Sequence, residues 1–366
     1  MSAANTHFRS ALLQWGAAVH RPMPWKGERD PYKIWLSEII LQQTRVEQGL
    51  PYYLKFVEQF PDVKSLADAP EETVFKCWEG LGYYSRARNL HQSAKQVAYT
   101  LSGVFPDTFE GLRALKGVGD YTAAAIASFA YDQPHAVLDG NVYRILSRYF
   151  GIETAIDLPE ARKKYGKLAQ DLLADAPPAA YNQAIMDFGA LQCVPKNPNC
   201  GSCPLAAHCV ALAQARVGEL PRKEKKLLKR TRHFCYFVFN VEGNCWVQRR
   251  SAADIWQDLF EFPQNESEAL PENRAEAQIS LEKWLKKHKI QGRAEILHCS
   301  GVQKQTLTHQ YIRAVFCEIQ GDEALGAALD SLPELRSSKR ADLKKNFSFP
   351  KILDKYLEEY VSLSLF

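Results

Sequence analysis

The sequence lacks any segment that would direct it into or across a membrane. Its first 25 residues have no basic start, no continuous apolar stretch and no small-residue cleavage site, and no later segment reaches transmembrane length. The sequence also lacks an even number of cysteines, because it contains nine. We therefore expect an intracellular, cytoplasmic protein without a disulfide framework, because disulfides are rare in reducing compartments.

The chain also lacks a strong net charge, which is only +4 over 366 residues. The total charge therefore does not by itself argue for a nucleic-acid partner. The basic residues are concentrated, however, because residues 222–232 hold seven of them against the single acid Glu224. The seven are Arg222, Lys223, Lys225, Lys226, Lys229, Arg230 and Arg232. This pattern is typical of a solvated linker and equally of a segment that follows a phosphate backbone.

Length and hydrophobic patterning predict more than one domain. A chain of 366 residues with 46% hydrophobic content exceeds the usual size of one compact core, and it contains no fixed-period repeat. Residues 1–215 carry apolar residues at three- and four-residue spacing, broken by Pro, Gly or Asp, and predict an all-α domain. After a basic linker over 216–230, residues 231–366 predict a separate α/β domain.

The second domain carries three local signals. The β-rich run at 233–240, the turn-forming residues 242–244 and the run at 245–250 predict a β-hairpin. Residues 311–319 alternate as a strand does, and residues 275–290 have the pattern of an amphipathic helix.

Four of the nine cysteines lie within seventeen residues and predict a metal centre. They are Cys193, Cys200, Cys203 and Cys209, spaced CxxxxxxCxxCxxxxxC. Four thiolates suit either tetrahedral zinc or a [4Fe-4S] cube, but zinc modules usually pair two CxxC knuckles, and only Cys200 and Cys203 form one here. The spacing therefore favours the cube. The other five predict ordinary small core residues: Cys77, Cys235, Cys245, Cys299 and Cys317.

A glycine-rich turn lies between two helical patterns at residues 115–121. Without side chains, Gly117 and Gly119 let backbone N–H groups approach an anion, and the following helix adds its positive N-terminal dipole. The sequence is therefore typical of a helix-hairpin-helix turn that binds DNA phosphate. An isolated GxG is also compatible with a plain loop.

Two acidic residues have contrasting surroundings. Glu38 lies in the apolar segment 35–41, where burial would raise the pKa of its carboxyl. Asp139 precedes the helical pattern that begins at Gly140. Locally these residues also fit an exposed helical glutamate and a simple N-cap. Together they match the acid and the anion that cleavage of an N-glycosidic bond requires.

The combination of motifs resembles the helix-hairpin-helix iron-sulfur DNA glycosylases, and within them the adenine DNA glycosylases (MutY family). The resemblance rests on six segments in the family's order, of which the last is the four-cysteine loop. The other five are WLSEIILQQTRV (35–46), GLGYYSRARNLH (80–91), LKGVGDYTAAAIASFAY (115–131), VLDGNVYRILSR (137–148) and YNQAIMDFGALQC (181–193). The resemblance implies an all-α glycosylase domain with a [4Fe-4S] cluster, followed by a Nudix-like α/β domain.

The resemblance also implies a reaction. The enzyme would act as a monomer on double-stranded DNA with A:8-oxoguanine or A:G mispairs, removing the adenine after base flipping. Glu38 would be the general acid at adenine N7, Asp139 would face the developing sugar cation, and Asn141 would orient that site. Tyr121 occupies the position of the Schiff-base lysine in the endonuclease III group, and a tyrosine forms no imine. Hydrolytic base removal without lyase chemistry is therefore expected, with Tyr121 as a supporting contact.

Further residues correspond to the family's DNA contacts. Gln42, Gln43 and Tyr83 match the wedge that fills the gap left by the flipped base, since amides bond base edges and a ring stacks on bases. Arg86 and Arg88 follow Tyr83 and would meet phosphates or belong to a solvated face. A separate entry segment to the adenine pocket would be formed by Arg21, Met23 and Trp25.

The C-terminal domain would read the oxidised guanine. No REUxEExGU core of a Nudix hydrolase occurs between residues 262 and 290, so recognition and not hydrolysis is expected. The family's Phe-Ser-His contact loop corresponds to Leu307-Thr308-His309, which keeps the hydroxyl of Thr308 and the ring of His309 but loses the aromatic residue. The acidic Asp120 also departs from frequent hairpin choices and is expected to weaken a phosphate contact.

Three alternatives remain at this point. An endonuclease III-type enzyme for damaged pyrimidines is disfavoured by Tyr121 and by the extra domain. A DNA-binding scaffold would leave Glu38 and Asp139 without a catalytic role. A Nudix hydrolase with a helical accessory domain lacks the required box. The cysteine loop has no open ligand position, and the two candidate catalytic carboxylates lie elsewhere in the sequence, so we expect the cluster to fold the loop and to hold cations such as Lys196 against phosphate.

Overall fold

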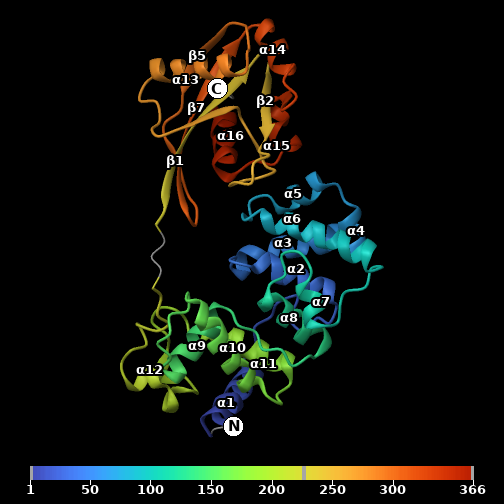
Figure 1. Ribbon diagram of the computed structural model, residues 1–366, viewed down its shortest axis with the longest axis vertical. Helices are drawn as coiled ribbons and strands as arrows, with labels where there is room; N and C mark the ends of the chain where they lie inside the picture. Colours follow the sequence, from blue (N-terminus) through green and yellow to red (C-terminus); the bar gives the residue numbers. More distant parts are fainter. Residues whose placement is uncertain (1–2, 225–227, 364–366) are drawn as a thin grey trace. The chain divides into compact units, whose positions relative to one another are not determined.

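The computed structural model describes residues 3–224 and 228–363. The chain divides into two compact units, which are described separately (Figure 1). The first comprises Met1–Ala69 and Arg88–Lys226, and the second comprises Pro70–Ala87 and Leu227–Phe366. A short segment of the N-terminal half, residues 70–87, thus packs with the C-terminal half. The boundaries expected from the sequence, at 215 and 231, stay a prediction.

The first unit is all-α, as the sequence predicts. Its longer helices are α1 (Ala3–Ala18), α2 (Pro31–Leu41), α3 (Val46–Gln59), α8 (Asp120–Tyr131), α9 (Gly140–Phe150), α10 (Pro159–Leu173) and α11 (Pro178–Leu191). Its shorter elements are α4 (Val63–Asp68), η1 (Gln96–Thr100), α7 (Phe109–Arg113), η2 (Cys200–Ser202), η3 (Ala206–His208) and α12 (Val210–Ala213). Helix α6 (Ser85–Lys95) begins in the second unit and continues into the first.

Capping residues and burial explain the helices that carry the candidate site. Asp30 caps α2 by accepting from the backbone N–H of Tyr32, and Pro31 follows at the first helical position. Eight of the eleven residues of α2 are buried, which is the behaviour expected of a helix that is apolar all round. Helix α8 is buried over seven consecutive residues, Thr122 to Ser128. The two helices pack against each other and bring Glu38 toward the start of α8.

The second unit contains two sheets. A five-stranded sheet has the order β4-β1-β7-β5, with β6 also paired to β7, and a three-stranded sheet has the order β3-β2-β8. The strands are β1 (Arg230–Asn240), β2 (Asn244–Arg249), β3 (Phe260–Glu261), β4 (Gln264–Ser267), β5 (Ala294–Cys299), β6 (Gln303–Thr306), β7 (Gln310–Gly321) and β8 (Leu335–Lys339). The helical elements are α5 (Glu71–Trp78), α13 (Arg274–Lys287), α14 (Glu323–Asp330), η4 (Arg340–Asp342), α15 (Leu343–Asn346) and α16 (Lys351–Leu363).

The central strand β1 is covered on both faces. Phe234, Tyr236 and Val238 point to a core that includes residues of α16, whereas Cys235, Phe237 and Phe239 point to a core that includes residues of α13 and α14 (Figure 1). This alternation follows from the two-residue period of a strand. The predicted α/β class, the strand at 311–319 and the helix at 275–290 are confirmed by β7 and α13.

The predicted β-hairpin is wrong. The turn exists, with Glu242 and Gly243 at positive φ and a single bridge between Val241 and Asn244. Beyond this bridge the strands diverge, because β1 pairs in parallel with β7 and antiparallel with β4, while β2 joins β8 and β3. The turn therefore joins two strands that belong to different sheets, and the ladder of each strand is formed with partners in its own sheet.

The basic run is largely engaged within the units. Arg222 pairs with Glu153 at 2.9 Å, Arg232 is bound by Asp254 and Glu266, and the Lys229 ammonium donates to the carbonyl of Leu307. Lys225 and Lys226 lie outside the described residues. Lys223 and Arg230 are exposed, so the linker and the phosphate-following segment both stay predictions. In the parts of the chain that the structure describes, no helix has the length and apolarity needed to span a membrane.

Candidate active site and metal centre

A cavity of about 480 Å³ in the first unit gathers nine of the residues predicted from the sequence. Its volume lies in the usual range for a small-molecule site. The nine are Arg21, Met23, Trp25, Glu38, Gln42, Gln43, Tyr121, Asp139 and Asn141. The remaining lining residues are Leu41, Val46, Gly140, Gln183, Met186 and Ala190. The two carboxylates, 101 positions apart in the sequence, therefore border one space.

Glu38 is buried inside α2, and only 9% of its surface is exposed. Burial raises the pKa of its carboxyl to about 7, and the negative charge of Asp139 acts in the same direction. A hydrogen bond with Tyr121 opposes this rise. At neutral pH, Glu38 therefore holds a proton for a substantial fraction of the time, as a general acid must.

Asp139 is the N-cap of α9 and is surrounded by donors. Its Oδ1 accepts from the backbone N–H of Val142 at 2.8 Å, and its Oδ2 accepts from the Asn141 amide at 2.8 Å. Burial raises the pKa of Asp139, whereas these hydrogen bonds and the charge of Arg144 lower it. The Asp139 carboxylate therefore caps α9 and borders the cavity at the same time.

Tyr121 lies between the acid and the apolar wall of the cavity. Its hydroxyl contacts the Met186 sulfur at 3.3 Å and is a hydrogen-bond partner of Glu38. Burial and the nearby carboxylates, Glu38 and Asp139, hold the pKa of the phenol above its ordinary value, so the hydroxyl keeps its proton. The protonated hydroxyl is therefore able to donate a hydrogen bond.

Asp187 is a buried acid that was not predicted from the sequence, and it binds side chains that line the cavity. Asp187 accepts from Arg21 at 2.8 Å, from Lys26 at 3.1 Å and from the amide of Gln183 at 3.0 Å. Arg21 and Gln183 both line the cavity. Asp187 lies in the segment 181–193, whose sequence pattern does not distinguish it from an ordinary helical residue.

The glycine turn adopts the predicted helix-hairpin-helix geometry between α7 and α8. Gly117 has φ +79°, and a Cβ there would lie 2.8 Å from the Cβ of Asn89, so a glycine is required. Gly119 precedes α8 as its N-cap without a side-chain cap. Asp120 is paired with Arg113 at 2.6 Å and also with Arg162. These pairs offset the acidic charge that the sequence suggested would oppose a phosphate.

The predicted wedge residues occupy unusual backbone conformations. Gln43 has φ +56° and Tyr83 has φ +51°, in the left-handed region that costs a non-glycine residue about 1 kcal/mol or more. Gln42 ends α2, and its amide lies 3.3 Å from the Thr122 hydroxyl. Strain of this kind accumulates at functional sites, and here it is found at two positions selected independently from the sequence.

Arg86 does not lie on a solvated face. Only 8% of its surface is exposed, its guanidinium lies 5.0 Å from the Trp78 ring and 5.5 Å from the Tyr83 ring, and it donates to the carbonyl of Gly82. Burial lowers the pKa of Arg86 to about 10. The guanidinium thus packs against both rings, and the phosphate contact expected of Arg86 stays a prediction. Arg88, on the same helix, is half-buried.

Thr308 and His309 lie in the loop of the β6–β7 hairpin. Both side chains are exposed, and the backbone N–H of Leu307 donates to the carbonyl of Gln310 to close the turn. The Thr308 hydroxyl is 2.5 Å from the Tyr83 hydroxyl. Two residues predicted to contact DNA, one from each half of the sequence, are therefore neighbours within the second unit.

The four clustered cysteines line one small cavity next to Arg148. Arg148 is buried and donates to the carbonyls of Val194 and Pro195 and to the Cys193 sulfur at 3.4 Å. Over residues 3–224 and 228–363, no group of three metal-binding side chains converges on a single ion. The four thiols thus border one shared space, and four thiolates are the ligand set of a [4Fe-4S] cube.

Helix α9 carries a hydrogen-bonded link between the cysteine loop and the 480 Å³ cavity. Arg144 donates through Nε to the Cys193 carbonyl at 2.7 Å and through Nη2 to the Asn141 side-chain oxygen at 2.8 Å. Asn141 in turn donates to Asp139. Gly189 permits the close approach, since a Cβ there would lie 2.5 Å from the Asn141 Cβ. The sequence reading missed Arg144, because nothing in a helical arginine indicates its partners.

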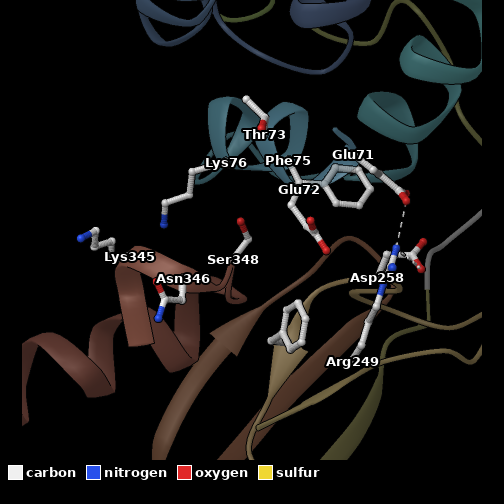
Figure 2. Close-up of a pocket in the computed structure, with 11 residues that line it drawn as sticks. Glu71, Glu72, Thr73, Phe75, Lys76, Arg249, Asp258, Lys345, Asn346 and Ser348 are labelled. Carbon is white, nitrogen blue, oxygen red and sulfur yellow. Dashed lines mark hydrogen bonds and ion pairs between the residues drawn. The ribbon is translucent and has the colours of Figure 1, made fainter. Parts of the chain in front are cut away.

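A second cavity, of about 240 Å³, lies in the second unit between α5 and the end of α15 (Figure 2). Arg249 reaches Glu71 at 3.2 Å and Asp258 at 3.2 Å, and Lys76 donates to the Lys344 carbonyl. None of the residues predicted for the site lines this cavity. Its paired charges hold α5 against the sheet and offer no acid–anion pair.

Three family models match separate parts of the chain. Residues 36–171 match the HhH-GPD superfamily of base excision DNA repair proteins, residues 193–209 match the iron-sulfur binding domain of endonuclease III, and residues 235–359 match the NUDIX domain. The second match begins at Cys193 and ends at Cys209. The protein carries a [4Fe-4S] cluster.

Curated relatives share one name. The adenine DNA glycosylase of Buchnera aphidicola subsp. Schizaphis graminum is 35% identical over 284 residues, covering 77% of this chain and 79% of that protein. The mouse adenine DNA glycosylase is 41% identical over 224 residues, covering 59% of this chain and 44% of that protein. The human one is 40% identical over 215 residues, covering 56% and 39%.

Solved structures agree on the fold of the helical part. A thermostable thymine-DNA glycosylase aligns with a TM-score of 0.54 and 29% identity, covering 58% of this chain and 97% of that one. A trapped endonuclease III–DNA covalent intermediate aligns with a TM-score of 0.51 and 20% identity, covering 59% and 99%. These structures share the fold of the helical part, and the 35% identity to the Buchnera enzyme over 79% of its length shows that the chain belongs to the adenine DNA glycosylase family of helix-hairpin-helix base excision repair enzymes.

Proposed function

We propose that this protein is a monofunctional glycosylase that hydrolyses the N-glycosidic bond of adenine mispaired with 8-oxoguanine or guanine in double-stranded DNA. It would act as a monomer inside the cell and leave an abasic site. The observation that carries the proposal is the presence of Glu38, Tyr121 and Asp139 around one cavity of the first unit. A buried acid and a hydrogen-bonded carboxylate are the two groups that such a cleavage needs.

Glu38 is the general acid in this mechanism. Its pKa of about 7, raised by burial, leaves a proton available to adenine N7 near neutral pH. Protonation of the base weakens its bond to the sugar and makes it a better leaving group. Tyr121 keeps the Glu38 carboxyl oriented through their hydrogen bond and, lacking an amine, forms no imine with the sugar.

Asp139 stabilises the oxocarbenium-like sugar. Its two oxygens are held by Val142 and Asn141, so its position is fixed before the substrate binds. Asn141 is fixed in turn by Arg144. A carboxylate already oriented toward the cavity stabilises the transition state without reorganising during the reaction.

Recognition of the mispair divides between the units. Gln42, Gln43 and Tyr83 enter the space left by the flipped adenine, and the hairpin of Gly117 and Gly119 binds the backbone with its N–H groups. Arg21, Met23 and Trp25 contact the extruded adenine, which is supported by their place on the cavity. Thr308 and His309 read the opposite guanine, which is supported by their exposure and by the contact of Thr308 with Tyr83.

The iron-sulfur cluster is proposed to be held by Cys193, Cys200, Cys203 and Cys209. Four thiolates complete the ligand set of a [4Fe-4S] cube and leave no open position for substrate. When the cluster is bound, these four residues would hold the loop between Cys193 and Cys209 in its folded form, and the exposed Lys196 would be available to phosphate. We also propose a domain division at residues 1–215 and 231–366, with the basic linker 216–230 between them.

Adenine release and strand cleavage, measured separately, test this function. The purified protein is incubated with a duplex containing adenine opposite 8-oxoguanine, and free adenine is quantified by chromatography while strand breaks are measured on a denaturing gel. We expect adenine release without prompt strand cleavage, and slower release from an A:G duplex. No adenine release would refute the proposal, and stoichiometric strand cleavage would favour an endonuclease III-type enzyme instead.

A further inference from the structure

Three of the cysteines outside the iron-sulfur loop are in contact in the second unit. Cys235 on β1, Cys317 on β7 and Cys299 at the end of β5 lie side by side across the five-stranded sheet. The Cys299 and Cys317 sulfurs are 2.7 Å apart, and the Cys235 and Cys317 sulfurs are 3.9 Å apart. All three are free thiols. Cys235 and Cys317 are buried, as expected of core residues, and the sheet also brings them together with Cys299.

The register of β5 and β7 places Cys299 and Cys317 in the right geometry for a disulfide. The two residues are directly opposite in an antiparallel pair. The next pair, Ser300 and Phe316, is joined by a backbone hydrogen bond of 2.8 Å, so Cys299 and Cys317 form a non-hydrogen-bonded pair. The Cα atoms of such pairs are about 4.5 Å apart. This separation falls within the range of about 4.4–6.8 Å that disulfides span.

The two thiols differ in accessibility. Cys299 is half-buried, whereas Cys317 and Cys235 are buried. The pKa of the Cys299 thiol is lowered because Cys317 donates a hydrogen bond to it, while burial opposes this effect. The reachable sulfur is thus also the one with more thiolate character, which is the form that reacts with oxidants.

We propose that Cys299 and Cys317 are a reversible redox pair that a hydroperoxide converts to a disulfide. The Cys299 thiolate attacks one oxygen of hydrogen peroxide, the O–O bond breaks, and the products are a sulfenic acid and hydroxide, which takes up a proton as water. The Cys317 thiol then attacks the Cys299 sulfur, forming the S–S bond and releasing a second water. Both thiols are oxidised and one peroxide is reduced, so atoms and electrons balance. A dithiol reductant reverses the reaction.

The disulfide would close a loop that contains the β6–β7 hairpin. Residues 300–316 lie between the two cysteines and include Thr308 and His309 at the hairpin tip. A covalent link at the base of this segment limits its opening and lowers the entropy of its unfolded state. The redox chemistry is independent of the function proposed above. Its consequence for guanine recognition rests on that function.

Peptide mapping of the oxidised protein tests the assignment directly. Full-length, cluster-loaded protein is treated with hydrogen peroxide, free thiols are blocked under denaturing conditions, and disulfide-linked peptides are identified by mass spectrometry. We expect a Cys299–Cys317 linkage that disappears after dithiothreitol. In Cys299→Ser, the oxidised fraction of Cys317 should fall by roughly tenfold, because its accessible partner is missing. Cys245→Ser, which alters a buried cysteine of the same unit, should leave the linkage unchanged.

Other results would overturn the proposal. A Cys235–Cys317 linkage, or oxidation of Cys299 only to sulfinic acid, would show that Cys317 does not resolve the sulfenic acid. No oxidation of Cys299 at peroxide levels that already oxidise the loop at Cys193–Cys209 would also contradict it. Limited proteolysis gives a second readout, since the linked protein should be cleaved more slowly between residues 300 and 316 than the reduced protein. Equal cleavage rates would contradict the proposed effect on the hairpin.

Discussion

Replacing Glu38 with glutamine should stabilise the protein at alkaline pH and change it little in acid. The pKa of Glu38 is raised from 4.5 to about 7 by burial, so the folded state holds the proton more tightly than the unfolded state does. Below pH 4.5 both states are protonated and the favourable contribution is complete. It is lost as the pH rises through 7, because the folded state must then bury a carboxylate.

The magnitude follows from the same values. Each tenfold difference in proton affinity is worth about 1.4 kcal/mol, so the buried carboxylate costs about 3 kcal/mol once the pH exceeds about 8. Glutamine cannot ionise, and its carbonyl still accepts from Tyr121. For a unit of this size, relief of about 3 kcal/mol corresponds to a rise in melting temperature of roughly 6–12 °C.

The assay is a series of matched thermal scans between pH 5.5 and 8.5 on the wild type, Glu38→Gln and Glu47→Gln. Glu47 is an exposed acid on α3 and serves as the control. The advantage of Glu38→Gln should grow with pH, while Glu47→Gln should follow the wild type throughout. A difference between Glu38→Gln and the wild type that does not change with pH would refute the idea that Glu38 is held protonated by burial.

Three further predictions concern neighbouring parts of the molecule. Arg144→Met removes the donor to the Cys193 carbonyl and to Asn141, so adenine release at saturating DNA should fall by roughly 10- to 100-fold. Arg144→Lys should recover part of this rate. Equal rates for the wild type and Arg144→Met would contradict the link along α9. Cys203→Ser should lower the iron content, the melting temperature and the DNA affinity more strongly than the single-turnover rate. Unchanged DNA binding by a protein without its cluster would contradict this expectation. Tyr83→Phe keeps the ring and loses only the contact to Thr308, so it should bind mispaired DNA far better than Tyr83→Ala. For Tyr83→Ala, a loss of about 1–3 kcal/mol in binding free energy is expected. Equal losses for the two variants would show that the ring does not stack.

Features encoded within short stretches were predictable from the sequence. The spacing of the four cysteines, the turn at Gly117 and the N-cap at Asp139 each depend on neighbours within a few residues, and the structure has the turn and the cap as expected. The position of Glu38 and Asp139 around one cavity was not predictable in this way, because no local pattern specifies that these two residues meet. That expectation came from the order of the motifs and from the family resemblance.

The errors and omissions have a common physical origin. The turn at Glu242 and Gly243 was identified, but a turn signal does not specify which strand becomes the ladder partner, and β1 pairs with β7 instead. Asp187 and Arg144 were missed because their roles depend on groups that reach them from other helices. Likewise, only the sheet order brings Cys299 and Cys317 together.

The most direct test of the central claim is the single-turnover rate of adenine release by two nearly isosteric variants. Glu38→Gln removes the proton donor, and Asp139→Asn removes the anion while keeping a good N-cap residue on α9. Asp62→Asn is the matched control, because Asp62 caps α4 away from the cavity. We predict that both site variants bind mispaired DNA but release adenine more slowly by a factor of roughly 100 or more, while Asp62→Asn matches the wild type. Release at the wild-type rate by either site variant would contradict the assignment of acid and anion to these two carboxylates.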